Sequence, residues 1–221
     1  GSTAWPAKKQ KEIAHRYMLG LYKILENITS NFPNILFESC SGGGGRFDGG
    51  MLYYMPQTWT SDDTDAIERL MIQEGTSLVY PTSSMGSHVS AVPNHQVHRI
   101  TPLNTRGVVA MAGSFGYELD VTKMNEEEKE EVKKQVEFYK NIRSTVQFGD
   151  LYRLKSSFDS NEAAWMNLSK DGKEVVVSYV KKYAEANVIP RRLKVKALDE
   201  NSLYEVIETG EVFGGDELMY I

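Results

Sequence analysis

The first 148 residues alternate between helical and strand-like patterns, and this alternation restricts the fold more than any other feature of the chain. Helical segments show apolar residues at spacings of three and four, whereas the strand-like segments are short apolar or aromatic runs. Such alternation predicts βαβ units and a parallel sheet. The predicted helices are 6–30, 63–73, 101–112 and 125–145, and the predicted strands are 35–37, a run ending near Trp59, 77–80 and 114–119.

The pattern changes after residue 148, where no helical stripe continues and short β-branched or aromatic runs alternate with turns. The string KDGK at 170–173 is typical of a hairpin turn. We therefore predict two domains, 1–148 and 149–221, of which the second is a small antiparallel β-sandwich. Its predicted strands are 151–154, 164–168, 175–180, 193–195 and 204–207.

Four parallel strands fit two architectures, a small doubly wound sheet or half of an eight-stranded (β/α)8 barrel. A half barrel by itself exposes two sheet edges, which favour aggregation. The barrel interpretation therefore implies that this chain is part of a larger protein.

Composition excludes several classes of partner. The 221 residues carry a net charge of -5, with both signs mixed, which argues against nucleic acid and anionic membranes as partners. No apolar run approaches the roughly 18 residues of a membrane-spanning helix. Cys40 is the single cysteine, so no intrachain disulfide framework exists, and we predict a reducing, cytoplasmic compartment.

The glycine-rich string SGGGGRFD at 41–48 lacks the Gly-Lys-Ser/Thr ending of a phosphate-binding loop. It is either a passive linker or a place where the backbone must pass close to a ligand, and its position after a strand favours the second interpretation. Cys40 is a small core residue or a nucleophile that needs a base. His88, His95 and His98 are candidate bases, and their spacing fits no helical metal motif, so we predict no metal.

The string WTSDDTDAIERL at 59–70 contains three aspartates with two possible uses. Ser61 or Asp62 can cap the following helix, and Asp65 falls in its first turn. Alternatively, one aspartate is a catalytic acid, held protonated near working pH by the neighbouring Asp63 or by burial near Trp59. Spacing alone does not separate the two uses.

Several strings together carry a resemblance to a known family. FESCSGGGGRFDGGMLYYMPQTWTSDDTDAIERL, GTSLVYP, GSHVSAVPNHQ and GSFGYELD resemble the α-galactosidases of glycoside hydrolase family 36 in order and spacing. The resemblance implies a (β/α)8 barrel flanked by β-domains, a homotetramer, and no metal or organic cofactor. It also implies retaining hydrolysis of terminal α-1,6-linked galactose from galactosides such as melibiose and raffinose.

The resemblance also implies roles for individual residues. Asp62 matches the acid/base of the family, and Cys40 and Gly42 match residues that contact galactose. We add Trp59 to the predicted substrate-binding residues. Glu38, which its place at a strand end makes a catalytic candidate, has no catalytic counterpart in the family.

One departure from the family bears on activity. The family nucleophile is an aspartate in a Lys-Trp-Asp string, and no such string occurs among these residues. The chain therefore resembles strands five to eight of the barrel plus the carboxyl-terminal β-domain, and we expect it to be inactive alone. The alternative is a non-catalytic carbohydrate-binding or assembly module built on a half barrel.

Overall fold

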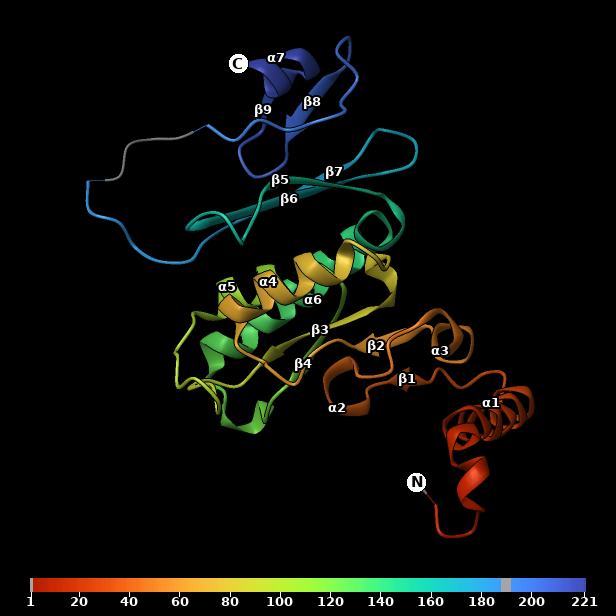
Figure 1. Ribbon diagram of the computed structural model, residues 1–221. Coiled ribbons are helices and arrows are strands. Elements are labelled where there is room, and N and C mark those ends of the chain that lie inside the picture. Colours follow the sequence, from red (N-terminus) through yellow and green to blue (C-terminus); the bar gives the residue numbers. More distant parts are fainter. Residues whose placement is uncertain (1, 188–191) are drawn as a thin grey trace.

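The computed structural model of the protein describes residues 2–187 and 192–221. A layer of helices lies between a parallel sheet and a group of antiparallel strands (Figure 1). Within the described residues, no helix combines the length and the apolar character needed to cross a membrane.

The parallel sheet has four strands in the order β1-β2-β3-β4, and each neighbouring pair is parallel. This confirms the parallel sheet expected from the alternation. Since the strands are parallel, the loops that follow them meet at one edge of the sheet. The strands are β1 (Glu38–Ser39), β2 (Gln57–Trp59), β3 (Met85–Ser90) and β4 (Ser114–Glu118).

The helices confirm the four predicted helical segments, with shifted ends. The short helices α2, α3, η2, η3 and α7 were not predicted, and α7 lies in the part of the chain that was expected to contain only strands. In Figure 1, helices α4, α5 and α6 lie between the two groups of strands. Helix α6 begins with a capping box, in which Asn125 accepts from the Glu128 amide and Glu128 accepts from the Asn125 amide. The helices are η1 (Ala7–Glu12), α1 (Ile13–Asn31), α2 (Ser41–Gly44), α3 (Gly49–Tyr54), α4 (Ala66–Ser77), η2 (Thr82–Ser84), α5 (Leu103–Ala110), η3 (Val121–Lys123), α6 (Glu126–Phe148) and α7 (Gly215–Tyr220).

Two strand predictions in the first 148 residues were wrong. The run 35–37 is not a buried strand, since β1 begins only at Glu38 and Leu36 is 70% exposed. The run leads into β1, which is an edge strand of the sheet. On the outer side of β1, no other strand of the described residues pairs with it. The run 77–80 is the end of α4 and a turn, and Val79 is 76% exposed.

The true third strand, β3, lies between the predicted strand 77–80 and the predicted helix 101–112, in a stretch for which no element was predicted. Its Ser87 is fully buried, and the Ser87 hydroxyl donates to Gln73 Oε1 of α4 at 2.6 Å. A polar residue can occupy a central strand when a helix supplies its hydrogen-bond partner. Because this partner lies on another element, the strand could not be predicted from local composition.

The antiparallel strands follow α6 in two groups. Strands β5 (Asp150–Lys155), β6 (Glu162–Leu168) and β7 (Val175–Lys181) form one sheet, and β8 (Leu203–Val206) pairs with β9 (Glu211–Gly214). The predicted hairpin at 170–173 is confirmed, with Gly172 at φ +73°. The predicted strand at 193–195 was wrong, because the Val195 amide donates to Leu218 O of α7 instead of to a strand.

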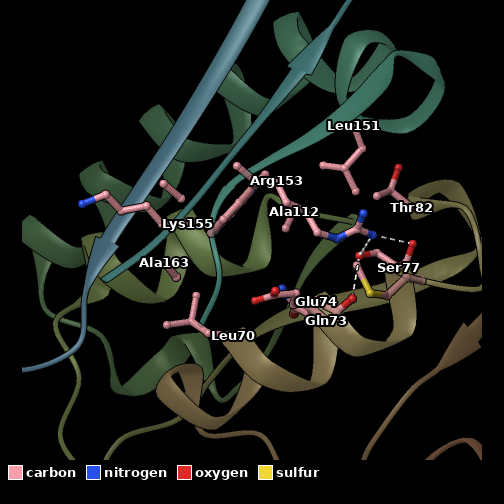
Figure 2. A pocket seen from close by; sticks show the side chains of 13 residues that line it. Leu70, Gln73, Glu74, Ser77, Thr82, Ala112, Leu151, Arg153, Lys155 and Ala163 are labelled. Carbon is pink, nitrogen blue, oxygen red and sulfur yellow. Dashed lines mark hydrogen bonds between the residues drawn. The ribbon is translucent and has the colours of Figure 1, made fainter. Parts of the chain in front are cut away.

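One hydrophobic core joins the helices to the antiparallel sheet. It combines residues of α4, α5, β6 and β7. Figure 2 shows Arg153 of β5 directed at Ser77 beside a small cavity of about 40 Å³, and Arg153 Nη2 donates to Ser77 O at 2.7 Å. The buried core residues are Ala66, Ile67, Leu70, Val109, Ala163 and Val180.

Candidate active site

Three loops at the carboxyl ends of neighbouring parallel strands form the candidate site. They are residues 40–45 after β1, 60–65 after β2 and 91–99 after β3. Carboxyl ends of parallel strands are the usual location of ligand sites in α/β proteins. The cavity of Figure 2 is separate, because its lining includes Thr82 and Met85, which lie at the amino end of β3, the end opposite to the loop 91–99.

The glycine-rich loop is one turn of left-handed helix. Ser41, Gly42, Gly43 and Gly44 have φ values of +60°, +66°, +70° and +86°. The Gly44 amide donates to Cys40 O at 2.9 Å, which closes the turn. Successive residues adopt this conformation at low cost only when most of them are glycine. The string is therefore an ordered turn, and the passive-linker interpretation was wrong.

This glycine turn contacts the backbone of the segment 60–62. A Cβ atom on Gly43 would lie 2.7 Å from the Asp62 nitrogen, and one on Gly44 would lie 3.0 Å from Thr60 O. A Cβ atom on Gly42 would meet nothing within 4 Å. Position 43 thus requires glycine because the backbone of Asp62 lies too close for a side chain. Gly42 borders open space where a ligand can lie.

The three aspartates have different uses. Asp65 is the N-cap of α4, and its Oδ2 accepts from the Ile67 amide at 3.0 Å and the Glu68 amide at 3.1 Å. Asp65 is almost completely buried and also pairs with Arg99. The helix begins at Ala66, three residues later than predicted, so the sequence's other capping candidates, Ser61 and Asp62, do not cap it.

Asp62 is exposed and takes no part in the cap. Its Oδ1 lies 4.0 Å from Cys40 Sγ, which is also exposed. The structure therefore brings together Cys40, Gly42 and Asp62, which the sequence predicted as site residues. Cys40 does not have the buried position of a small core residue.

The loop after β3 holds the segment that follows Asp62. Asn94 Nδ2 donates to Thr64 Oγ1 at 3.0 Å, and the Thr64 amide donates to Gln96 Oε1 at 3.2 Å. The Asp62 backbone is therefore held between the glycine turn and the loop 91–99, while its carboxyl group remains accessible to solvent.

Trp59 is the last residue of β2, directly before the loop 60–65, and is only 8% exposed. Its ring stacks on the His88 ring at a centroid distance of 4.6 Å, and the Arg69 guanidinium lies 4.3 Å from the Trp59 ring centroid. Glu38 accepts from the Gln57 side chain of the neighbouring strand. A substrate-binding role for Trp59 stays a prediction, and the packing makes Trp59 a support for the segment that carries Asp62.

The sequence did not identify Arg69 as a residue next to the site, and it did not predict that His88 packs on Trp59. Arg69 and Gln73 lie three and seven positions after Ala66 on the buried face of α4. A charged residue on an apolar helix face is the signal that could have identified Arg69.

The three histidines after residue 85 lie apart from one another. His88 Nδ1 lies 3.8 Å from Glu118 Oε2, whereas His95 and His98 are exposed in the loop. In the part of the chain that the structure describes, no three His, Cys, Asp or Glu side chains gather as metal ligands do.

The family model described as Melibiase matches residues 1–149, which include all three loops of the site. The chain belongs to the melibiase family. A second model, the glycosyl hydrolase family 36 C-terminal domain, matches residues 162–221 of this melibiase-family chain. The family resemblance that the sequence indicated is thereby confirmed.

Relatives of this melibiase-family chain are alpha-galactosidases. Alpha-galactosidase AgaA of Geobacillus stearothermophilus is 64% identical over 220 residues, which cover 100% of this chain and 30% of AgaA. Alpha-galactosidase Mel36A of Lactobacillus acidophilus is 57% identical over 216 residues, which cover 98% of this chain and 29% of Mel36A. A crystal structure of an AgaA variant in complex with raffinose matches with a TM-score of 0.96 at 63% identity, over 100% of this chain and 30% of that one. The chain thus spans about 30% of the length of these relatives.

Proposed function

We propose that this chain supplies the acid/base and part of the sugar-binding surface of a retaining α-galactosidase. The observation that carries the proposal is the exposed Asp62 carboxyl group, which lies 4.0 Å from Cys40 Sγ at the carboxyl edge of the parallel sheet and is not used by the helix cap. Membership in the melibiase family supports the reaction class. Galactosides related to raffinose are the proposed substrates, because an AgaA structure at 63% identity contains raffinose.

Retaining hydrolysis needs two carboxyl groups about 5–5.5 Å apart, one as nucleophile and one as acid and then base. Asp62 is the proposed acid/base, which protonates the leaving oxygen and later deprotonates the attacking water. Cys40 and Gly42 border the space beside it and are proposed to contact the galactose. No Lys-Trp-Asp string occurs in residues 1–221, so the nucleophile of this proposal is not among them.

The same proposal extends to the architecture. We propose that β1 to β4 correspond to strands five to eight of a (β/α)8 barrel, and that residues 149–221 form a β-sandwich domain distinct from 1–148. The strand order and the boundary between the two family models support this assignment. A cytoplasmic homotetramer without metal or organic cofactor completes the proposal.

The acid/base assignment is tested by leaving-group dependence. The chain is co-expressed with an amino-terminal α-galactosidase segment that contains a Lys-Trp-Asp string, and hydrolysis of raffinose and of 4-nitrophenyl α-galactoside is compared. Asp62→Asn is expected to lower raffinose hydrolysis by about 10²–10⁴-fold and aryl galactoside hydrolysis far less, because a good leaving group needs little protonation. Asp159→Asn is the matched control, because Asp159 is exposed in the turn between β5 and β6, and it should leave both rates unchanged. Equal losses on both substrates in Asp62→Asn would make Asp62 a structural residue.

The chain by itself is expected to show no turnover of an aryl α-galactoside. Turnover at the rate of an intact relative would contradict the need for a second carboxyl group from outside these residues. Calorimetry with galactose then tests the non-catalytic alternative. Millimolar binding without turnover, even after co-expression, would favour a carbohydrate-binding module.

A further inference from the structure

Arg69 is a buried cation placed beside the segment that carries Asp62. It projects from the second turn of α4 and is 2% exposed. Burial of a charged side chain is costly unless hydrogen bonds compensate for the lost water. The partners of the guanidinium group therefore indicate what the residue holds in place.

Each nitrogen of the guanidinium group has an acceptor. Nη1 donates to Ser61 O at 3.1 Å, and Nη2 donates to Thr60 Oγ1 and to Gly86 O, both at 3.1 Å. Nε donates to Gln73 Oε1 at 3.3 Å. Two of these acceptors belong to the two residues immediately before Asp62, and a third belongs to the neighbouring strand β3.

The acceptors are neutral, which separates this site from an ordinary buried ion pair. Burial lowers the pKa of Arg69 to about 10, and the charges of Asp63 and Glu118 act in the opposite direction. Arg69 is therefore a cation at neutral pH. For stability alone, a buried apolar side chain of similar size often serves as well. The planar fork of arginine adds geometry, since it ties Thr60 and Ser61 to β3 at once.

We propose that Arg69 is a positioning residue that fixes the backbone before Asp62 and thereby sets the place of the Asp62 carboxyl group. The inference rests on the proposed acid/base role of Asp62. The glycine turn bounds the 60–62 segment by contact alone, with the Gly43 position 2.7 Å from the Asp62 nitrogen when a Cβ is added. Arg69 bonds the same segment to β3 through Ser61 O and Gly86 O. Without the guanidinium group these bonds are lost, and the segment can move away from the glycine turn.

Cys40 gives a direct readout of the Asp62 position. It is the single cysteine of the chain, it is exposed, and its sulfur lies 4.0 Å from Asp62 Oδ1. A carboxylate at this distance repels the anionic reagent 5,5′-dithiobis(2-nitrobenzoate) and slows its reaction with the thiol. Asp62→Asn should accelerate this reaction by about fivefold, as expected for one charge at this distance in water.

The test compares the rates of this reaction in the full chain and its variants. Arg69→Met is expected to accelerate the reaction by most of the factor seen in Asp62→Asn, because the released carboxylate leaves the thiol. Arg69→Lys should fall between wild type and Arg69→Met, since an ammonium group cannot reach all of these acceptors. Arg153→Met is the matched control, because Arg153 also donates to a backbone carbonyl, Ser77 O, and to Ser77 Oγ, but at the end of α4 remote from Asp62. Its rate should equal that of wild type.

The double variant Arg69→Met/Asp62→Asn decides the mechanism. If Arg69 acts through the Asp62 carboxylate, the double variant reacts no faster than Asp62→Asn alone. Additive acceleration, acceleration in Arg153→Met, or an unchanged rate in Arg69→Met would each overturn the inference. Should Arg69→Met fail to fold, Arg69→Lys and its double variant with Asp62→Asn give the same comparison. The thiol assay needs no hydrolysis, so its outcome is independent of the leaving-group test of the proposed function.

Discussion

The close approach of the glycine turn to the Asp62 segment makes a quantitative prediction for Gly43→Ala. Gly43 has φ +70°, and an added Cβ would lie 2.7 Å from the Asp62 nitrogen and 3.1 Å from the Ser61 Cα. Both atoms are backbone, so they cannot rotate away as a side chain does. Alanine in the left-handed conformation destabilises the fold by about 1–2 kcal/mol. The close contact of its Cβ destabilises the fold by about a further 1–3 kcal/mol.

Gly42→Ala separates the two costs. Gly42 has φ +66°, but an added Cβ there meets no atom within 4 Å. This variant is therefore destabilised by the left-handed conformation alone. The reduced entropy of the unfolded chain offsets about 0.4–1 kcal/mol of this loss. We expect Gly42→Ala to lose about 1 kcal/mol of unfolding free energy and Gly43→Ala to lose about 2–4 kcal/mol.

Urea unfolding of the two variants, followed by circular dichroism, measures the difference. The conformational and unfolded-state effects are shared, so the difference between the variants isolates the contact with the Asp62 segment. Equal losses of unfolding free energy for Gly42→Ala and Gly43→Ala would refute the argument that this segment requires glycine at Gly43.

Two further predictions concern hydrogen bonds of carboxylates. Asp65→Ala should lower the unfolding free energy by about 2–3 kcal/mol, because it removes the helix cap and leaves Arg99 unpaired, whereas Asp62→Asn should change it by less than about 0.5 kcal/mol. Comparable losses of unfolding free energy for both would contradict the division of roles. Burial raises the pKa of Glu74, but hydrogen bonds from Ser157 outweigh burial and leave the pKa below its usual value. The stability that Glu74 contributes is therefore complete above about pH 4.5 and is lost as the pH falls through the lowered pKa. Urea midpoints should fall less steeply in acid for Glu74→Gln than for wild type, and parallel pH profiles would speak against this linkage.

Much of the fold followed from local patterns. The helical periodicity of α4 to α6 and the turn at Gly172 are properties of a few consecutive residues, and the structure confirms them. The predicted run 77–80 shows the limit of this reasoning. Its apolar residues suggested a strand, but they lie exposed in a turn after α4, while the polar segment that contains Ser87 is the buried strand.

The site shows the same division. The sequence alone indicated Cys40, Gly42 and Asp62, because their strings match a family, and it left open which aspartate caps the helix. The tertiary structure decided this point. Asp65 is the cap because α4 begins at Ala66, and a carboxylate bonds free amides only in the first turn.

Only the tertiary structure identified Arg69. Its acceptors Ser61 O and Gly86 O are eight and seventeen residues away, and they converge because β2 and β3 are adjacent parallel strands. Residue types and their spacing indicated the long helices and the proposed acid/base, Asp62. The packing of separate elements determined where the Asp62 carboxyl group is held, because its supports come from parts of the chain that meet only after folding.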